Sequence, residues 1–169
     1  QGIKPAVELA PLTSDRWHYR RKARMSVRLV KGKGRGLVGF REHDGRFGTD
    51  MDSCETLYPL VADALPALSA LVQSLDAADR VPQIEASCGD EEGALVIRIL
   101  DPLAEPDRDR LRAFELSSNL RVYLQPKGPD TVHPLTEGPS RLRYTLPEEG
   151  LSFRFEPLDF VQVNNALNA

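Results

Sequence analysis

The sequence predicts an α+β fold, with a largely antiparallel sheet and packed helices, from three patterns of apolar residues. Residues 22–29 alternate apolar and mostly basic side chains, which is the period of a strand that buries one face. Residues 57–75 carry leucine, valine and alanine at the spacing of an amphipathic helix. Short apolar segments separated by turn residues follow in the second half, as expected for antiparallel strands.

The first half is expected to form a basic hairpin followed by an interrupted helix. Strand 22–29 turns through the segment Lys-Gly-Lys-Gly-Arg-Gly and returns over 37–41. Within the helical stretch 57–75, Pro59 suits a first turn, whereas Pro66 should kink the helix or divide it in two.

The second half is expected to complete the sheet around one further helix. That helix is predicted over residues 106–114. Acidic residues lie at its start, where negative charge is stabilised by the positive end of the helix dipole. Two strands joined by an acidic loop are predicted at 83–87 and 94–100, and three shorter strands at 122–125, 142–146 and 151–155.

The composition is that of an ordinary soluble globular protein, with 169 residues, 41% hydrophobic residues and a net charge of −3. No run approaches the roughly 18 apolar residues of a membrane span. The amino terminus lacks the pattern of a signal peptide, and two cysteines cannot form a disulfide framework. We therefore expect a cytoplasmic protein with no membrane partner.

The charges are distributed unevenly along the chain. Up to Arg46 there are 12 Lys and Arg against 4 Asp and Glu, and after it there are 10 against 21. A basic end on an acidic body suits a polyanionic partner better than a membrane surface, because the basic residues lie in a strand and not on an amphipathic helix. The alternative is a basic face that is merely solvated.

The segment from Trp17 to Arg24 places the aromatic residues Trp17 and Tyr19 beside a dense group of cations. Guanidinium and ammonium groups contact phosphates, and aromatic rings stack on unpaired bases, which is how single-stranded RNA is commonly held. The candidate RNA contacts from this segment are Arg20, Arg21, Lys22 and Arg24.

The two cysteines have no partners at metal-ligand spacing, since the chain has no Cys-x-x-Cys and its three histidines are scattered. Cys88 is expected to be a small buried hydrophobic residue. The carboxylates that follow it should raise the pKa of its thiol, so it is a poor candidate for a nucleophile. Cys54 precedes the predicted interrupted helix.

The end of the chain, 155–168, is rich in polar amides. Amides offer paired donors and acceptors that can bind a base edge or a cofactor, and Phe160 could stack on a base. The alternative is a loop at a chain end that does no more than fray.

Five segments, taken in order and spacing, resemble the RNA 5-methyluridine methyltransferases, most closely the branch that acts on bacterial 23S ribosomal RNA. They are Trp17–Arg24, Val38–Glu42, Cys54 before a helix, Leu124–Pro126 and Phe155–Asn168. In that family a TRAM domain precedes a central domain, and a Rossmann-like methyltransferase domain follows it. The resemblance implies a lead-in segment at 1–18, the central RNA-contacting domain at 19–157 and the truncated start of the methyltransferase domain at 158–169.

The resemblance also implies cofactors and site residues. Three of the family's four iron–sulfur ligands lie upstream and the fourth matches Cys54, so no intact 4Fe–4S cluster is expected in this chain alone. Gln162 matches a residue of the S-adenosyl-L-methionine site, and Phe160 one beside the pocket for the flipped uridine. The family's catalytic Cys and carboxylate base have no counterpart here, so the chain alone is expected to be inactive.

The expected function is therefore that of a fragment of an enzyme that makes 5-methyluridine in 23S ribosomal RNA, with no obligate protein partner. Three alternatives remain open: a tRNA uridine methyltransferase of the same family, a stand-alone RNA-binding module, and a structural domain with a solvated basic face. Residues 160–169 are expected to fray or to be captured by a neighbouring molecule, because their own domain is missing.

Overall fold

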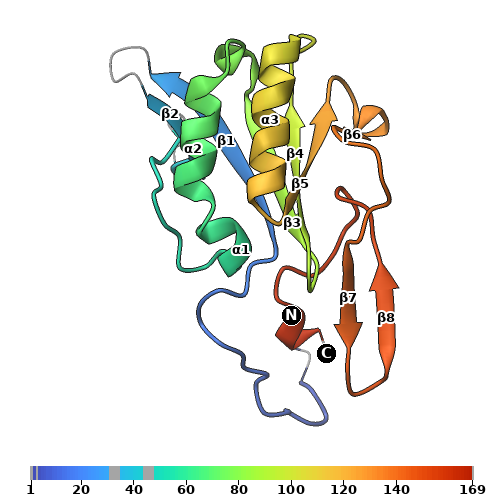
Figure 1. Ribbon diagram of the computed structural model, residues 1–169. Coiled ribbons are helices and arrows are strands. Elements are labelled where there is room, and N and C mark those ends of the chain that lie inside the picture. Colours follow the sequence, from blue (N-terminus) through green and yellow to red (C-terminus); the bar gives the residue numbers. More distant parts are fainter. Residues whose placement is uncertain (1, 3, 31–34, 44–47, 169) are drawn as a thin grey trace.

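A computed structural model describes residues 2, 4–30, 35–43 and 48–168, and the fold it shows is a six-stranded sheet with helices on one face (Figure 1). The strands lie in the order β2-β1-β3-β4-β5-β6, and every neighbouring pair is antiparallel except β4 and β5. The strands are β1 (Lys22–Val30), β2 (Arg35–Gly39), β3 (Gln83–Cys88), β4 (Gly93–Arg98), β5 (Leu120–Gln125) and β6 (His133–Pro134). The predicted fold class is confirmed.

The basic hairpin and the later strands lie where the sequence predicts them. β1 pairs with β2 and, on its other edge, with β3. The predicted turn between β1 and β2 includes residues 31–34, which lie outside the described residues. β6 was not predicted from the sequence, because a two-residue strand is too short to show a period of alternation.

The interrupted helix is also confirmed, and its break has the expected cause. It forms α1 (Pro59–Ala62) and α2 (Leu65–Ser74), with one proline at the first or second position of each helix. At these positions a backbone N–H has no acceptor within the helix, so proline, which lacks that N–H, removes no helical hydrogen bond. The parallel pair β4 and β5 is joined through α3 (Glu105–Ser117). No helix in the described ranges is long and apolar enough to cross a bilayer.

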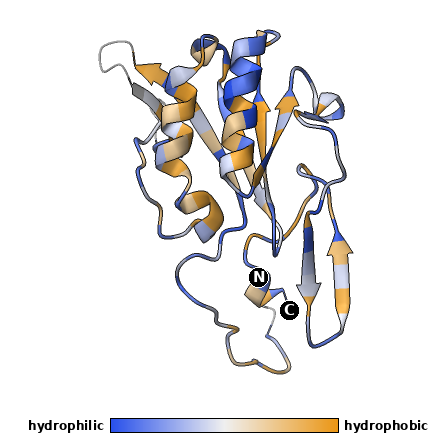
Figure 2. Cartoon of the chain, viewed as in Figure 1, coloured by the Kyte–Doolittle hydropathy of each residue, from blue (hydrophilic) through white to orange (hydrophobic). Residues whose placement is uncertain are grey.

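The main core lies between the helices and one face of the sheet. Figure 2 shows the hydrophobic strands lying behind α2 and α3, with the outer surface of α3 largely hydrophilic. Met25, Ile84, Ile97 and Leu124 are cross-strand neighbours on β1, β3, β4 and β5, and all four are buried. Because these four buried side chains are aligned across the strands, this face of the sheet packs against the helices.

A second, smaller core lies on the opposite face and explains why β4 is apolar throughout. Ala94, Val96 and Tyr123 are covered there by Leu142 and Phe155. These two residues flank a separate hairpin of β7 (Arg143–Leu146) and β8 (Leu151–Arg154), which projects beyond the end of the sheet (Figure 1). Because β4 is buried on both faces, its sequence cannot alternate.

A buried carboxylate joins α3 to the segment after α2. Asp107 has no exposed surface, and its two oxygens accept hydrogen bonds from the backbone N–H groups of Asp76 and Ala77, both at 2.9 Å. Arg110 forms an ion pair with the same carboxylate at 2.5 Å. Asp107 therefore provides the acceptor for two backbone N–H groups that lie just after α2 and are not bonded within a helix.

Replacing Asp107 with Ala is expected to destabilise the fold by about 2–3 kcal/mol, because two backbone donors lose a charged acceptor. Urea unfolding measures the change in free energy. Asp109→Ala is the matched control, since Asp109 sits on the same helix in an exposed ion pair with Arg112 and should cost about 0.5 kcal/mol or less. Equal losses in the two variants would contradict the role given to Asp107.

Candidate nucleic-acid interface at the start of β1

The chain segment that leads into β1 lies alongside the loop that precedes α1. The backbone N–H of His18 donates to the Glu55 carbonyl at 2.7 Å, and that of Arg20 donates to Thr56 at 2.9 Å. The Tyr58 N–H in turn donates to the Arg20 carbonyl at 2.9 Å. These bonds bring the aromatic and basic segment beside the loop of Cys54, a contact that the sequence pattern alone does not reveal.

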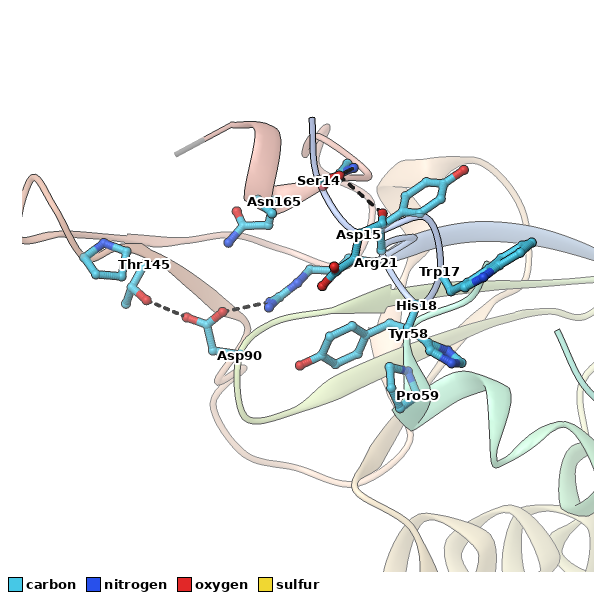
Figure 3. A pocket seen from close by; sticks show the side chains of 14 residues that line it. Ser14, Asp15, Trp17, His18, Arg21, Tyr58, Pro59, Asp90, Thr145 and Asn165 are labelled. Carbon is cyan, nitrogen blue, oxygen red and sulfur yellow. Dashed lines mark hydrogen bonds and ion pairs between the residues drawn. The ribbon is translucent and has the colours of Figure 1, made fainter. Parts of the chain in front are cut away.

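A cleft of about 520 Å³ opens at this junction (Figure 3). Its walls also include Thr145, Pro147 and residues 14–15 and 164–166. The side chains that dominate its lining are those of Trp17, His18, Tyr19, Arg21, Tyr58 and Asp90. Trp17 is 55% exposed, so its ring is open to a stacking partner.

Arg21 is held inside this cleft by Asp90 and the Tyr58 ring (Figure 3). Its guanidinium donates to Asp90 at 2.7 Å and lies 4.6 Å from the centre of the Tyr58 ring. Thr145 donates to the other oxygen of Asp90 at 3.0 Å, which connects the pair to β7. The charge of Arg21 is therefore largely satisfied within the chain, although the sequence suggests an RNA contact.

Lys22 also has partners within the chain. Its ammonium group donates to the carbonyl oxygens of Asp159 and of Pro157, the latter at 3.3 Å. Burial lowers the pKa of Lys22 below its ordinary value, against the opposing effect of Glu85 and Asp159. Lys22 therefore anchors the segment that leads to Phe160.

The other two cations predicted to contact RNA are Arg20 and Arg24. Arg20 is half-buried next to the loop before α1. The Arg24 side chain is 69% exposed and lies 3.0 Å from Glu85, on the face of the sheet away from the helices. Of these four cations, Arg21 and Lys22 are bonded to distant segments, Arg20 is half-buried, and Arg24 is exposed but paired with Glu85.

The C-terminal segment packs along the start of β1, contrary to the expectation that it frays. The Arg21 N–H donates to the Val163 carbonyl at 2.9 Å, and the Asn164 amide donates to the Ser14 hydroxyl at 2.7 Å. Its packing partners are thus present within this chain. Phe160, 84% exposed, and Gln162, also exposed, leave their side chains accessible.

His18 holds a backbone conformation that is unusual for its type. Its φ is 56°, in the left-handed region, which costs about 1–2 kcal/mol for a residue with a Cβ. The ring Nδ1 lies 3.2 Å from the Leu57 carbonyl, and Nε2 lies 3.7 Å from the Glu55 carboxylate. Contacts from the loop before α1 hold this strained residue at the rim of the cleft.

The two cysteines differ in environment. Cys54 is half-buried, with its sulfur 3.3 Å from the Thr56 hydroxyl. Cys88 is fully buried, and burial raises the pKa of its thiol to about 12, opposed by the charge of Arg21. The predicted direction is confirmed, but burial and not the acidic neighbours is its cause. No group of three or more His, Cys, Asp or Glu within the described ranges could hold a metal ion.

Comparison with curated proteins finds close relatives, although no protein-family model matches the chain. It is 48% identical over 166 residues to the 23S rRNA (uracil(1939)-C(5))-methyltransferase RlmD of Paracidovorax citrulli, covering 98% of this chain and 34% of that protein. The RlmD of Bordetella pertussis is 48% identical over 167 residues, with 36% of its length covered. The chain therefore spans about a third of the length of these relatives.

Among solved structures, the chain is similar to the tRNA (uracil-54, C5)-methyltransferase of Pyrococcus abyssi in complex with S-adenosyl-L-homocysteine. The TM-score is 0.61, and the similarity covers 90% of this chain and 39% of that one. At 16% identity this similarity shows the fold alone.

The difference between the cysteines predicts their reactivity. At pH 8 a thiol reagent such as DTNB should react with Cys54 in the folded chain, whereas Cys88 stays protonated and out of reach. Cys54→Ser should abolish the fast reaction, and Cys88→Ser should leave it unchanged. Denatured protein, in which both thiols react, is the control. A fast reaction that survives in Cys54→Ser would contradict the assignment.

Proposed function

From homology to the 23S rRNA (uracil-C5)-methyltransferases over 98% of the chain, we propose that this chain is part of such an enzyme and helps to hold its RNA substrate. The observation that carries the proposal is an identity of 46–48% to several of these proteins. Their names give uracil 1939 of 23S ribosomal RNA as the target, and we propose the same target here.

The accessible groups around the cleft support RNA contact. Trp17 presents an open aromatic ring at the cleft. Arg20 follows three residues later in the same segment, and Arg24 adds an exposed cation further along β1. Stacking and phosphate contact together are the usual means of holding unpaired RNA. Arg21 and Lys22, predicted from the sequence to contact RNA, also position the segments around the cleft. Arg21 does so through Asp90, and Lys22 through the carbonyl groups of Pro157 and Asp159.

The segment after Pro157 is proposed to face the reaction site of the complete enzyme. Methylation at uracil C5 requires an unstacked base, and exposed Phe160 can stack against one. Gln162, exposed two residues later, is proposed to bind S-adenosyl-L-methionine through its amide. When bound, that cofactor supplies the methyl group. Lys22 holds the backbone immediately before Phe160, so it orients both side chains indirectly.

Cys54 is proposed as one ligand of a 4Fe–4S cluster. Its thiol is half-buried in a loop, whereas Cys88 is sealed within the core, so only Cys54 fits a ligand shared with another segment. A 4Fe–4S cluster needs four such ligands. The described residues hold no group of three or more His, Cys, Asp or Glu that could bind a metal ion, so we propose that the other three ligands come from another segment. When bound, the cluster would cross-link the loop before α1 to the segment that carries the other thiolates.

The test of the methyl-transfer proposal is transfer from labelled S-adenosyl-L-methionine to unmodified 23S ribosomal RNA. The full gene product that carries this sequence, purified anaerobically, should form 5-methyluridine at position 1939. This 169-residue chain alone should form none. Absence of product from a folded, cluster-loaded full gene product would refute the proposal, and product in tRNA alone would favour the tRNA enzymes.

RNA contact by the cleft predicts a loss of affinity when its exposed ring is removed. Trp17→Ala should cost about 1–3 kcal/mol of stacking, which raises the Kd for a single-stranded fragment of 23S ribosomal RNA roughly 5- to 150-fold. Fluorescence anisotropy measures the Kd. Leu116→Ala, which removes an exposed apolar side chain from α3, should leave it unchanged. An unaltered Kd in Trp17→Ala would argue against stacking in the cleft.

A further inference from the structure

The face of the sheet that lies away from the helices is covered over only part of its area. Ala94, Val96 and Tyr123 are covered by the second core. Next to them runs a polar row across three strands, in which Gln83 pairs with Arg98 and Arg98 pairs with Gln125. This row lies on the helix-free face, because the adjacent row through Ile84 and Ile97 faces the helices.

A groove of about 470 Å³ lies over this polar row. Four cations line it: Arg24 from β1, Arg98 from β4, and Arg41 and Lys127 from the segments that follow β2 and β5. Glu85 is its one lining carboxylate among the described residues. The groove is therefore strongly positive, although the chain as a whole carries a net charge of −3.

Only one of the four cations in this groove is paired with a carboxylate among the described residues. Glu85 is already bonded to Arg24 and accepts from the Gln83 amide, both at 3.0 Å. Within the described ranges, Arg98 and Lys127 form no ion pair. Arg112 on α3, by contrast, pairs with both Glu105 and Asp109. Arg98 and Lys127 are thus available to an anionic ligand.

The shape and chemistry of the groove favour the sugar–phosphate backbone of an RNA strand. Strands about 4.8 Å apart place β1 and β5 about 14 Å from each other, which matches about four stacked nucleotides at about 3.4 Å each. Three of the four cations are arginines, whose planar fork matches phosphate oxygens. The amides of Gln83 and Gln125 add neutral donors and acceptors that suit ribose hydroxyls and base edges.

The groove is also connected to the proposed reaction site. Leu158 lines its edge, and exposed Phe160 follows two residues later on the segment that Lys22 anchors. We propose that this groove, centred on Arg98 and Lys127, binds the phosphates of the RNA strand that leads to the target uridine at Phe160. The proposal rests on the proposed function and extends it by assigning a path for the substrate strand.

The test is the binding of a labelled single-stranded 23S RNA fragment containing uridine 1939 to the 169-residue chain, measured by anisotropy at several salt concentrations. The double variant R98Q/K127Q should raise the Kd about 10-fold at low salt and reduce the slope of log K against log salt by about 1.4, since each lost phosphate contact accounts for about 0.7. The matched control R108Q/R112Q removes the same charge from α3 and should change neither quantity.

The outcomes separate the groove from the wider proposal. If R98Q/K127Q binds RNA with an unchanged Kd and salt slope while W17A binds weakly, the groove proposal is refuted and the proposed RNA contact at the cleft is retained. Failure of the unmodified chain to bind RNA at all would overturn both. Tighter binding of a poly-glutamate peptide than of RNA would assign the groove to an acidic protein partner and overturn the RNA path. If R98Q/K127Q does not fold, K127E at an exposed position after β5 should weaken binding to a similar extent.

Discussion

The pairing of β1 with β3 determines where every charge of the basic segment lies. Met25 opposite Ile84 turns one side of β1 towards the helices, so Lys22 and Arg24 must lie on the other side. A shift of one residue in this pairing would place cations in the main core and apolar side chains on the open face. The cost of burying those charges keeps the register in place. The basic face is thus a consequence of core packing as much as of its own sequence.

The same segment joins three parts of the chain that are far apart in sequence. Arg21 reaches Asp90 between β3 and β4, and Lys22 reaches the backbone after β8. Burial opposes the charge of Lys22, yet two carbonyl acceptors compensate for the water it loses. Arg21 and Lys22, which the sequence predicts as RNA contacts, therefore also anchor the loop and the segment around them. The cations left without an ion pair, Arg98 and Lys127, lie further along the sheet.

Local elements could be predicted from the sequence, whereas contacts between distant segments could not. The alternation in β1 and the positions of Pro59 and Pro66 carry their structural meaning within a few residues. The pairing of Arg21 with Asp90 spans 69 residues, and no local pattern specifies it. The expected fraying of the C-terminal segment was wrong for the same reason, because its partner is the start of β1. Arg98 and Lys127 were missed because cations on separate strands form a site only once the sheet is assembled.

The proposed roles of Cys54 and of the cleft depend on one short length of backbone. The bonds from His18 to Glu55 and from Arg20 to Thr56 hold the two segments in parallel. A cluster bound at Cys54 would therefore restrain Trp17 and Arg20 through two or three hydrogen bonds, without touching the RNA itself. The groove around Arg98 lies across the sheet from this junction and shares none of those bonds. Loss of the cluster should thus disturb stacking in the cleft more than phosphate binding in the groove.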